Sequence, residues 1–207
     1  MPRFGLLSFT LAALTTSALA EERVPSFVDM RLNAQGVTLG YKVDGSSLTH
    51  DISGRLGVSW TGSLGIQRWG GVVWGLGGTW GYGKDENADN IGQAGTNDYT
   101  IQTGTLDLFI GYAYAFRESL QIEIMPVVGL GKAWLRNSNG LSDADAYIEY
   151  GLRGNLTWTM DSGLQFGVVS DILLAPDNNL SSNVSGRPGG DFDNTRFAVG
   201  AFIGVRL

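Results

Sequence analysis

The sequence predicts an all-β fold, an eight-stranded antiparallel up-and-down transmembrane β-barrel, and three observations support this prediction. The chain starts with a secretory signal, which predicts export from the cytoplasm. Eight later segments alternate apolar and polar residues, as strands between lipid and a polar interior do. Short and long connections alternate between these segments, which is how the hairpins of an up-and-down barrel are joined.

The first twenty residues have the composition of a signal peptide. Met1-Pro2-Arg3 is a short positive start, residues 4–14 form an apolar run, and Ala18-Leu19-Ala20 is a small-x-small cleavage site. The apolar run is too short to span a hydrocarbon core, which needs about 20 apolar residues. We therefore expect residues 1–20 to be removed by cleavage near Ala20.

Composition narrows the class of protein. The chain has no cysteine, so disulfides and thiolate chemistry are excluded, and its formal net charge of −6 predicts no nucleic-acid partner. Its 31 glycines in 207 residues are about twice the usual share of about 7%. No later segment contains 18 consecutive apolar residues, so the sequence predicts no membrane-spanning helix. An exported chain with these traits and period-two patterning belongs in an outer membrane.

The strand pattern sets the expected boundaries. We expect residues 21–35 to form a periplasmic lead-in without a clear pattern and residues 36–207 to form the barrel. The clearest segment is 148–160, where residues such as Leu152 alternate strictly with residues such as Arg153. It exceeds the roughly 5–6 residues of a typical strand, which favours a membrane span. The predicted strands are 36–44, 52–66, 70–83, 99–116, 119–136, 146–160, 163–174 and 195–207.

The connections between these strands predict the orientation of the barrel. Those after even strands are short and those after odd strands are longer and polar, which indicates periplasmic turns, outer loops and periplasmic termini. The short connections are 67–69, Arg117-Glu118 and Asp161-Ser162. The longer connections are 45–51, 84–98, 137–145 and 175–194.

The inward faces of the predicted strands carry charge. Eight strands leave a space only just wide enough for side chains, and an unpaired ion there would cost several kcal/mol. We therefore predict an interior ion-pair network that includes Glu149 and Arg153, four residues apart on one strand face. The network either closes the barrel or gates a narrow path. Its predicted members are Lys42, Arg55, Asp107, Glu123, Glu149, Arg153, Asp171, Arg196 and Arg206.

Inward glycines have two interpretations. They either make room for Phe109, Phe202 and the long ionic side chains, or leave a cavity for an acyl chain or a small apolar solute.

Two residues of the predicted strand 119–136 do not fit the pattern. Lys132 falls on the lipid face, and Pro126 has no backbone N–H to donate to the neighbouring strand. A β-bulge within 127–131 would turn Lys132 inward; otherwise its side chain extends to the outer interface.

The outer loops contain weak candidates for metal binding and catalysis. Asp85, Asn87 and Asp89 are spaced as at the start of a calcium loop, but Asn90 replaces its glycine and Thr96 its closing glutamate. We therefore expect solvated acidic loops, with no metal and no cofactor.

The single histidine, His50, lies near Ser46, Ser47 and Asp51 in the first outer loop. A loop histidine beside serine resembles lipid A-modifying barrel enzymes, whose diagnostic motifs this chain lacks. A lone loop histidine is more often a solvated residue. We expect the protein not to be an enzyme.

The signal peptide, the eight strands, the alternating connections and the charged interior together resemble the small eight-stranded outer membrane proteins A, X and W. The likeness includes the Glu149 and Arg153 pair and the terminal strand from Phe197 to Leu207. That strand resembles the signal read by barrel assembly machinery, although the family usually ends in an aromatic residue. The resemblance implies an outer membrane location and leaves the specific role open.

The expected function is a structural or surface-interaction role in adhesion or envelope integrity. The expected partners are outer membrane lipid including lipopolysaccharide, the barrel assembly machinery and a surface ligand. A porin-like narrow channel for small solutes, including apolar ones, is the alternative, and a lipid A-modifying enzyme is the remote one.

Overall fold

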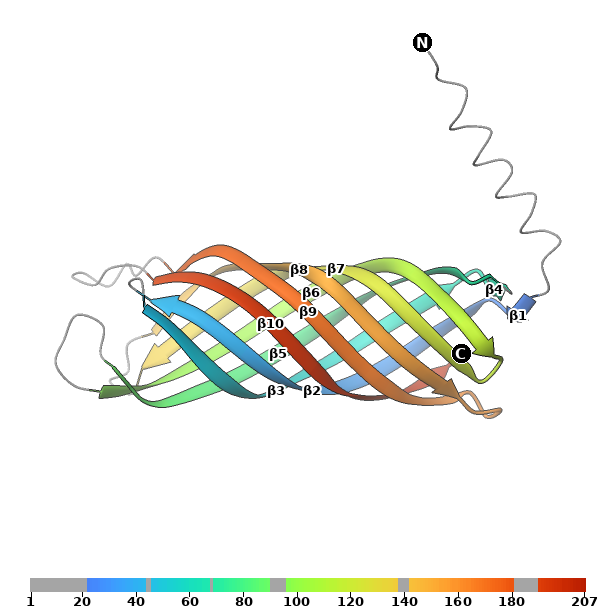
Figure 1. The fold of residues 1–207 in the computed structure, drawn as a ribbon, viewed down its shortest axis with the longest axis horizontal. Helices are drawn as coiled ribbons and strands as arrows, with labels where there is room; N and C mark the ends of the chain where they lie inside the picture. Colours follow the sequence, from blue (N-terminus) through green and yellow to red (C-terminus); the bar gives the residue numbers. More distant parts are fainter. Residues whose placement is uncertain (1–21, 44–45, 68, 90–95, 138–141, 181–189) are drawn as a thin grey trace, which may run out of the picture.

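The computed structural model describes residues 22–43, 46–67, 69–89, 96–137, 142–180 and 190–207. Eight of its strands form one closed antiparallel barrel in the order β10-β2-β3-β5-β6-β7-β8-β9 (Figure 1). The predicted fold class is therefore confirmed. No helix in the described part of the chain is long and apolar enough to cross a membrane.

The barrel strands are long and slant steeply around the barrel axis (Figure 1). Each pairs with its neighbour along the chain, and β10 pairs with β2 to close the sheet. The strands are β2 (Phe27–Val43), β3 (Ser46–Ser63), β5 (Gly71–Asp89), β6 (Thr96–Arg117), β7 (Leu120–Asn137), β8 (Ser142–Thr159), β9 (Leu164–Leu180) and β10 (Gly190–Arg206).

The first barrel strand begins earlier than the sequence analysis placed it. Strand β2 starts at Phe27, so most of the expected lead-in 21–35 is part of the barrel wall. Asp29 and Arg31 are buried inside, whereas Met30 between them is exposed. The alternation of residues in this part of β2 is regular, but its charged residues lie on the buried face. From the sequence they resembled a polar segment outside the barrel.

A small second sheet lies at the barrel end that carries the C-terminus (Figure 1). Strand β1 (Glu22–Val24) pairs with β4 (Ile66–Gln67), which lies within the connection from β3 to β5. Val24 and Ile66 are buried and join the apolar cluster that includes Phe27 and Val73. The connection from β3 to β5, in which a short turn was expected at 67–69, therefore contains a strand whose Ile66 packs against this end of the barrel.

At the opposite end the strands extend into segments expected to be loops. Strand β3 begins at Ser46, so His50 belongs to a paired strand rather than to the loop 45–51. Strand β5 likewise continues to Asp89. The backbone pairing therefore continues past the part of the sequence in which apolar and polar residues alternate.

The anomalous strand β7 keeps its register. Residue pairing with β8 is continuous from Leu120 to Arg136, so the bulge within 127–131, one of the two alternatives for Lys132, does not form. Lys132 therefore faces outward and is exposed. Pro126 is also exposed, and the pairing with β6 skips its position without shifting register. A proline can interrupt the ladder locally because the flanking residue pairs hold the strands together.

Two inward phenylalanines pack over glycines on the adjacent strand. Phe109 pairs across the sheet with Gly75, where an added Cβ would lie 2.3 Å from the ring. Phe202 pairs in the same way with Gly167, where the corresponding distance is 2.6 Å. These glycines make room for aromatic side chains, which supports the first of the two interpretations of the inward glycines.

We predict that Gly167→Ala destabilises the barrel by about 1–3 kcal/mol, because overpacking forces Phe202 or the backbone to move. The measurement is the urea unfolding midpoint of the protein in lipid vesicles. Gly78→Ala is the matched control, because an added Cβ there meets only ordinary contacts of 3.7 Å or more. Equal midpoints for the two variants would contradict this packing argument.

Candidate functional site

The charged side chains inside the barrel form two clusters. The lower cluster, near the end that carries the C-terminus, comprises Asp29, Arg31, Gln121, Glu123, Asn155, Gln165 and Arg206. The upper cluster, farther along the barrel, comprises Gln35, Arg55, Thr79, Thr105, Asp107, Tyr147, Glu149, Arg153 and Asp171.

Glu123 is the centre of the lower cluster. Arg31 donates two hydrogen bonds to its carboxylate, at 2.6 Å and 2.7 Å. Gln121 and Asn155 donate the other two. A carboxylate has about four acceptor sites, so all of them are filled although Glu123 is fully buried.

Asp29 joins the lower cluster to the barrel seam. Its oxygens accept from Arg31 at 3.0 Å, from Gln165 at 2.9 Å and from Arg206 at 2.9 Å. Asp29 lies on the first barrel strand and Arg206 directly opposite it on the last. This ion pair therefore links the two strands whose pairing closes the barrel.

Arg153 and Asp171 form the best-aligned pair of the upper cluster. They lie opposite each other on β8 and β9, and the guanidinium donates two bonds of 2.8 Å and 2.9 Å to the carboxylate. Gln35 donates a third bond to Asp171 at 3.1 Å. Two parallel hydrogen bonds from a guanidinium to a carboxylate are among the strongest polar interactions in proteins.

Arg55 and Asp107 are held less completely. Arg55 donates to Glu149 and to Thr79, but its nearest approaches to Asp107 and Asp171 are 3.6 Å and 3.5 Å. Asp107 accepts a bond from Thr105, whereas its Oδ2 has no hydrogen-bond partner among the described residues. The upper cluster is therefore looser than the lower one.

The charge balance of the two clusters also differs. The lower cluster pairs two carboxylates with two guanidinium groups. The upper cluster places three carboxylates against two guanidinium groups. This excess of one carboxylate is counted over the described residues only. The side chains of Lys42 and Arg196, two predicted interior cations, lie outside them.

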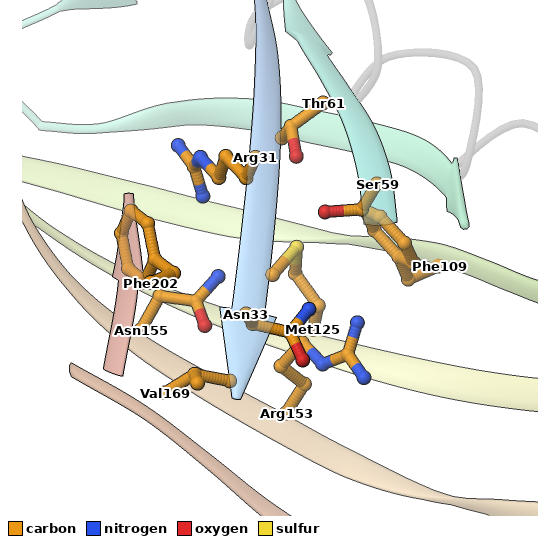
Figure 2. Close-up of a pocket in the computed structure, with 10 residues that line it drawn as sticks. All are labelled: Arg31, Asn33, Ser59, Thr61, Phe109, Met125, Arg153, Asn155, Val169 and Phe202. Atoms are coloured by element: carbon orange, nitrogen blue, oxygen red, sulfur yellow. The ribbon is translucent and has the colours of Figure 1, made fainter. Parts of the chain in front are cut away.

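An apolar and amide layer separates the clusters. It encloses a cavity of about 10 Å³, which is close to the minimum space for one water molecule (Figure 2). Arg31 lies over the Phe202 ring and Arg153 over the Phe109 ring, at 5.1 Å and 5.6 Å from their centres. The lining residues are Arg31, Asn33, Ser59, Thr61, Phe109, Met125, Arg153, Asn155, Val169 and Phe202.

The structure distributes the predicted interior residues between the clusters. Arg55, Asp107, Glu149, Arg153 and Asp171 come together in the upper one. Glu123 and Arg206 lie in the lower one. Glu149 and Arg153 do not rely on each other as the spacing suggested, because Glu149 binds Arg55 and Arg153 binds Asp171.

Asp29 and Arg31 are central to the lower cluster but were not among the predicted members of the network. Their alternation with exposed apolar residues was the available signal. The weak calcium candidates Asp85, Asn87 and Asp89 have side chains outside the described residues, so that expectation stays a prediction. Within the described part of the chain, no three His, Cys, Asp or Glu residues group as metal ligands.

We predict that Glu123→Ala destabilises the barrel by about 3–5 kcal/mol, because it leaves Arg31 buried without its bidentate partner. Asp107→Ala is the comparison and is expected to cost clearly less, because Arg55 and Arg153 retain Glu149 and Asp171. Urea unfolding in lipid vesicles measures both. A larger loss for Asp107→Ala would reverse the assignment of tight and loose clusters.

The fold of this chain is similar to that of known proteins, although its sequence is not. No protein-family model and no curated protein matches the sequence. Neisserial surface protein A matches with a TM-score of 0.57 and 8% identity, over 87% of this chain and 97% of that one.

Two further solved structures match this chain over nearly their whole length. Ail, the attachment invasion locus protein of Yersinia pestis in complex with the heparin analogue sucrose octasulfate, has a TM-score of 0.48 and 12% identity, over 87% of this chain and 99% of that one. The outer membrane protein OprG of Pseudomonas aeruginosa has a TM-score of 0.40 and 13% identity, over 89% and 97%. By its closed eight-stranded barrel and its likeness to Neisserial surface protein A, the chain has the fold of the small eight-stranded outer membrane β-barrel proteins.

Proposed function

We propose that the protein is an integral outer membrane barrel with a structural or surface-interaction role, whose interior is closed by the two ion-pair clusters. The small cavity between the clusters carries this proposal. Its volume of about 10 Å³ leaves no room for a solute larger than water. Function would then depend on the outer wall and the loop end of the barrel rather than on the lumen.

The outer wall supports a membrane location. Its exposed side chains are mostly large and apolar, and tryptophans occur toward both edges of this apolar band, with Trp80 and Trp134 toward one edge and Trp74 and Trp158 toward the other. An apolar wall flanked by aromatic residues is typical of a barrel in a bilayer. In water, an exposed apolar surface of this extent would drive aggregation.

A narrow channel is the second candidate, and the loose upper cluster favours it. Asp107 Oδ2 and two nitrogens of Arg55 are buried without hydrogen-bond partners among the described residues. Loosely held ion pairs exchange partners at a lower cost than filled ones. Such an exchange would have to open the adjacent apolar layer as well before a solute could pass.

We predict that the purified full-length gene product gives no steady openings in a planar bilayer, because the described side chains fill the lumen between the two clusters. The control is heat-modifiable migration in gels, which shows that the silent protein is folded. Steady, reproducible unit conductances from the folded protein would refute the closed interior and favour the channel.

Removal of an interior charge distinguishes the two candidates more sharply. We predict that Arg153→Ala lowers stability without raising conductance, because Phe109, Met125 and Phe202 still block the lumen. The measurements are the urea midpoint and single-channel current on the same preparation. Higher conductance at unchanged stability would identify Arg153 as part of a gate.

We further infer that the protein has no catalytic role in lipid modification. His50 is its single histidine, and its side chain lies outside the described residues. We predict that lipid A mass spectra of cells that express the wild type and the His50→Ala variant are identical. A lipid A species that depends on His50 would support the enzyme alternative.

A further inference from the structure

The cavity in the layer between the two clusters has a lining that is partly polar. Side chains with hydrogen-bonding groups reach it from β2, β3 and β8, namely Asn33, Ser59, Thr61 and Asn155 (Figure 2). All four residues are more than nine-tenths buried. A cavity that stays dry is lined by apolar side chains, whereas buried polar groups are bonded to one another or to ordered water. This lining therefore favours a hydrated cavity.

Two amide oxygens carry this argument. Oδ1 of Asn33 and Oδ1 of Asn155 are buried, and neither has a hydrogen-bond partner among the described residues. The ten residues that line the cavity, and the sheet neighbours of both asparagines, all belong to the part of the chain that the structure describes. A buried acceptor without a donor lowers stability, so each oxygen requires a donor.

The orientation of the Asn155 amide follows from its bond to Glu123. Nδ2 of Asn155 donates to the Glu123 carboxylate at 2.8 Å. An ionised carboxylate only accepts hydrogen bonds, so the amide cannot turn round without the loss of this bond. Oδ1 of Asn155 is therefore the atom that still requires a donor.

The position of the Asn33 amide depends on Gly57. The two residues lie opposite each other on β2 and β3. A Cβ added at Gly57 would lie 2.7 Å from Nδ2 and 2.8 Å from Oδ1 of Asn33. A side chain at this position would displace the amide from the wall. Gly57 therefore lets Asn33 pack against the wall, which leaves the cavity open beside it.

The lining also defines the chemical class of the occupant. Two acceptors require a molecule that donates two hydrogen bonds. Arg31 and Arg153 line the same cavity and disfavour a cation, whereas the two amide oxygens disfavour an anion. The volume of about 10 Å³ is the space of about one water molecule. A neutral double donor of this size is water.

We propose that the cavity binds one water molecule, which donates hydrogen bonds to Oδ1 of Asn33 and Oδ1 of Asn155. Asn155 belongs to the lower cluster through Glu123, and Arg153 of the upper cluster lines the same cavity. The water thus satisfies the polar groups of the layer between the clusters. The proposal rests on the closed interior proposed above and names the molecule that this interior holds.

The test is a crystal structure of the purified full-length gene product at a resolution that shows ordered water. We expect one density peak about 2.5–3.0 Å from both amide oxygens. Crystals grown with bromide in place of chloride distinguish water from an anion, because bromide has an anomalous signal. In lipid vesicles, solid-state NMR is expected to show magnetisation transfer from water to the Nδ2 hydrogens of Asn155.

Three variants test the two determinants of the site. Asn33→Leu removes one acceptor at similar volume, and it is expected to lose both the density peak and the NMR transfer. Thr157→Val is the matched control, because Thr157 is buried on the same face of β8 as Asn155 but does not line the cavity. This control is expected to keep both signals. Gly57→Ala retains both amides but displaces that of Asn33, so its loss of the peak tests the site even if Asn33→Leu does not fold.

The outcomes that overturn the proposal are distinct. Amide oxygens that accept from Ser59 or Thr61 in a cavity without density would refute the water site. An anomalous bromide peak would assign the cavity to an anion. An unchanged peak in Asn33→Leu would refute the bridge between the two asparagines. A continuous file of water peaks through the layer would instead refute the closed interior, which separates failure of the proposed function from failure of the water site.

Discussion

The rest of the structure depends on the need to satisfy every polar group inside a closed, narrow barrel. Lipid offers no hydrogen bonds, so the strands must pair all round, and eight strands leave space only for side chains. The Asp29 and Arg206 pair shows how one contact can meet both demands. It joins the first strand to the last, and together with Arg31 it neutralises the buried carboxylate of Asp29.

Much of the fold could be predicted from the sequence because lipid and interior impose opposite demands on alternate residues. The pattern was sufficient to identify eight strands. The pattern did not reveal strands where the alternation stops, or where the buried polar face could be mistaken for an exposed one. At the start of β2, Asp29 and Arg31 resemble a polar lead-in unless their buried side is known. At the loop end the sequence no longer alternates, so residues such as His50 continue a strand without any pattern to reveal it.

The members of the interior site were more predictable than their partners. Alternation indicates that a charge points inward, but the partner depends on the tilt of the strands and on which side chains reach across the lumen. Arg31 and Glu123 are 92 residues apart in the chain, and Arg55 and Glu149 are 94 apart. The spacing of Glu149 and Arg153 follows one wall of the barrel, whereas the Arg55 side chain crosses the interior. No short sequence motif records such a contact.

The two ion-pair clusters also decide where the described charges of the barrel lie. The described carboxylates of the barrel strands are all inside, where arginines and amides hold them. An unpaired ion in so narrow a space would cost several kcal/mol, so each of these carboxylates needs a guanidinium or amide within reach. The need to pair buried charges therefore accounts for residues that come from strands far apart in the sequence, such as Arg31 and Glu123.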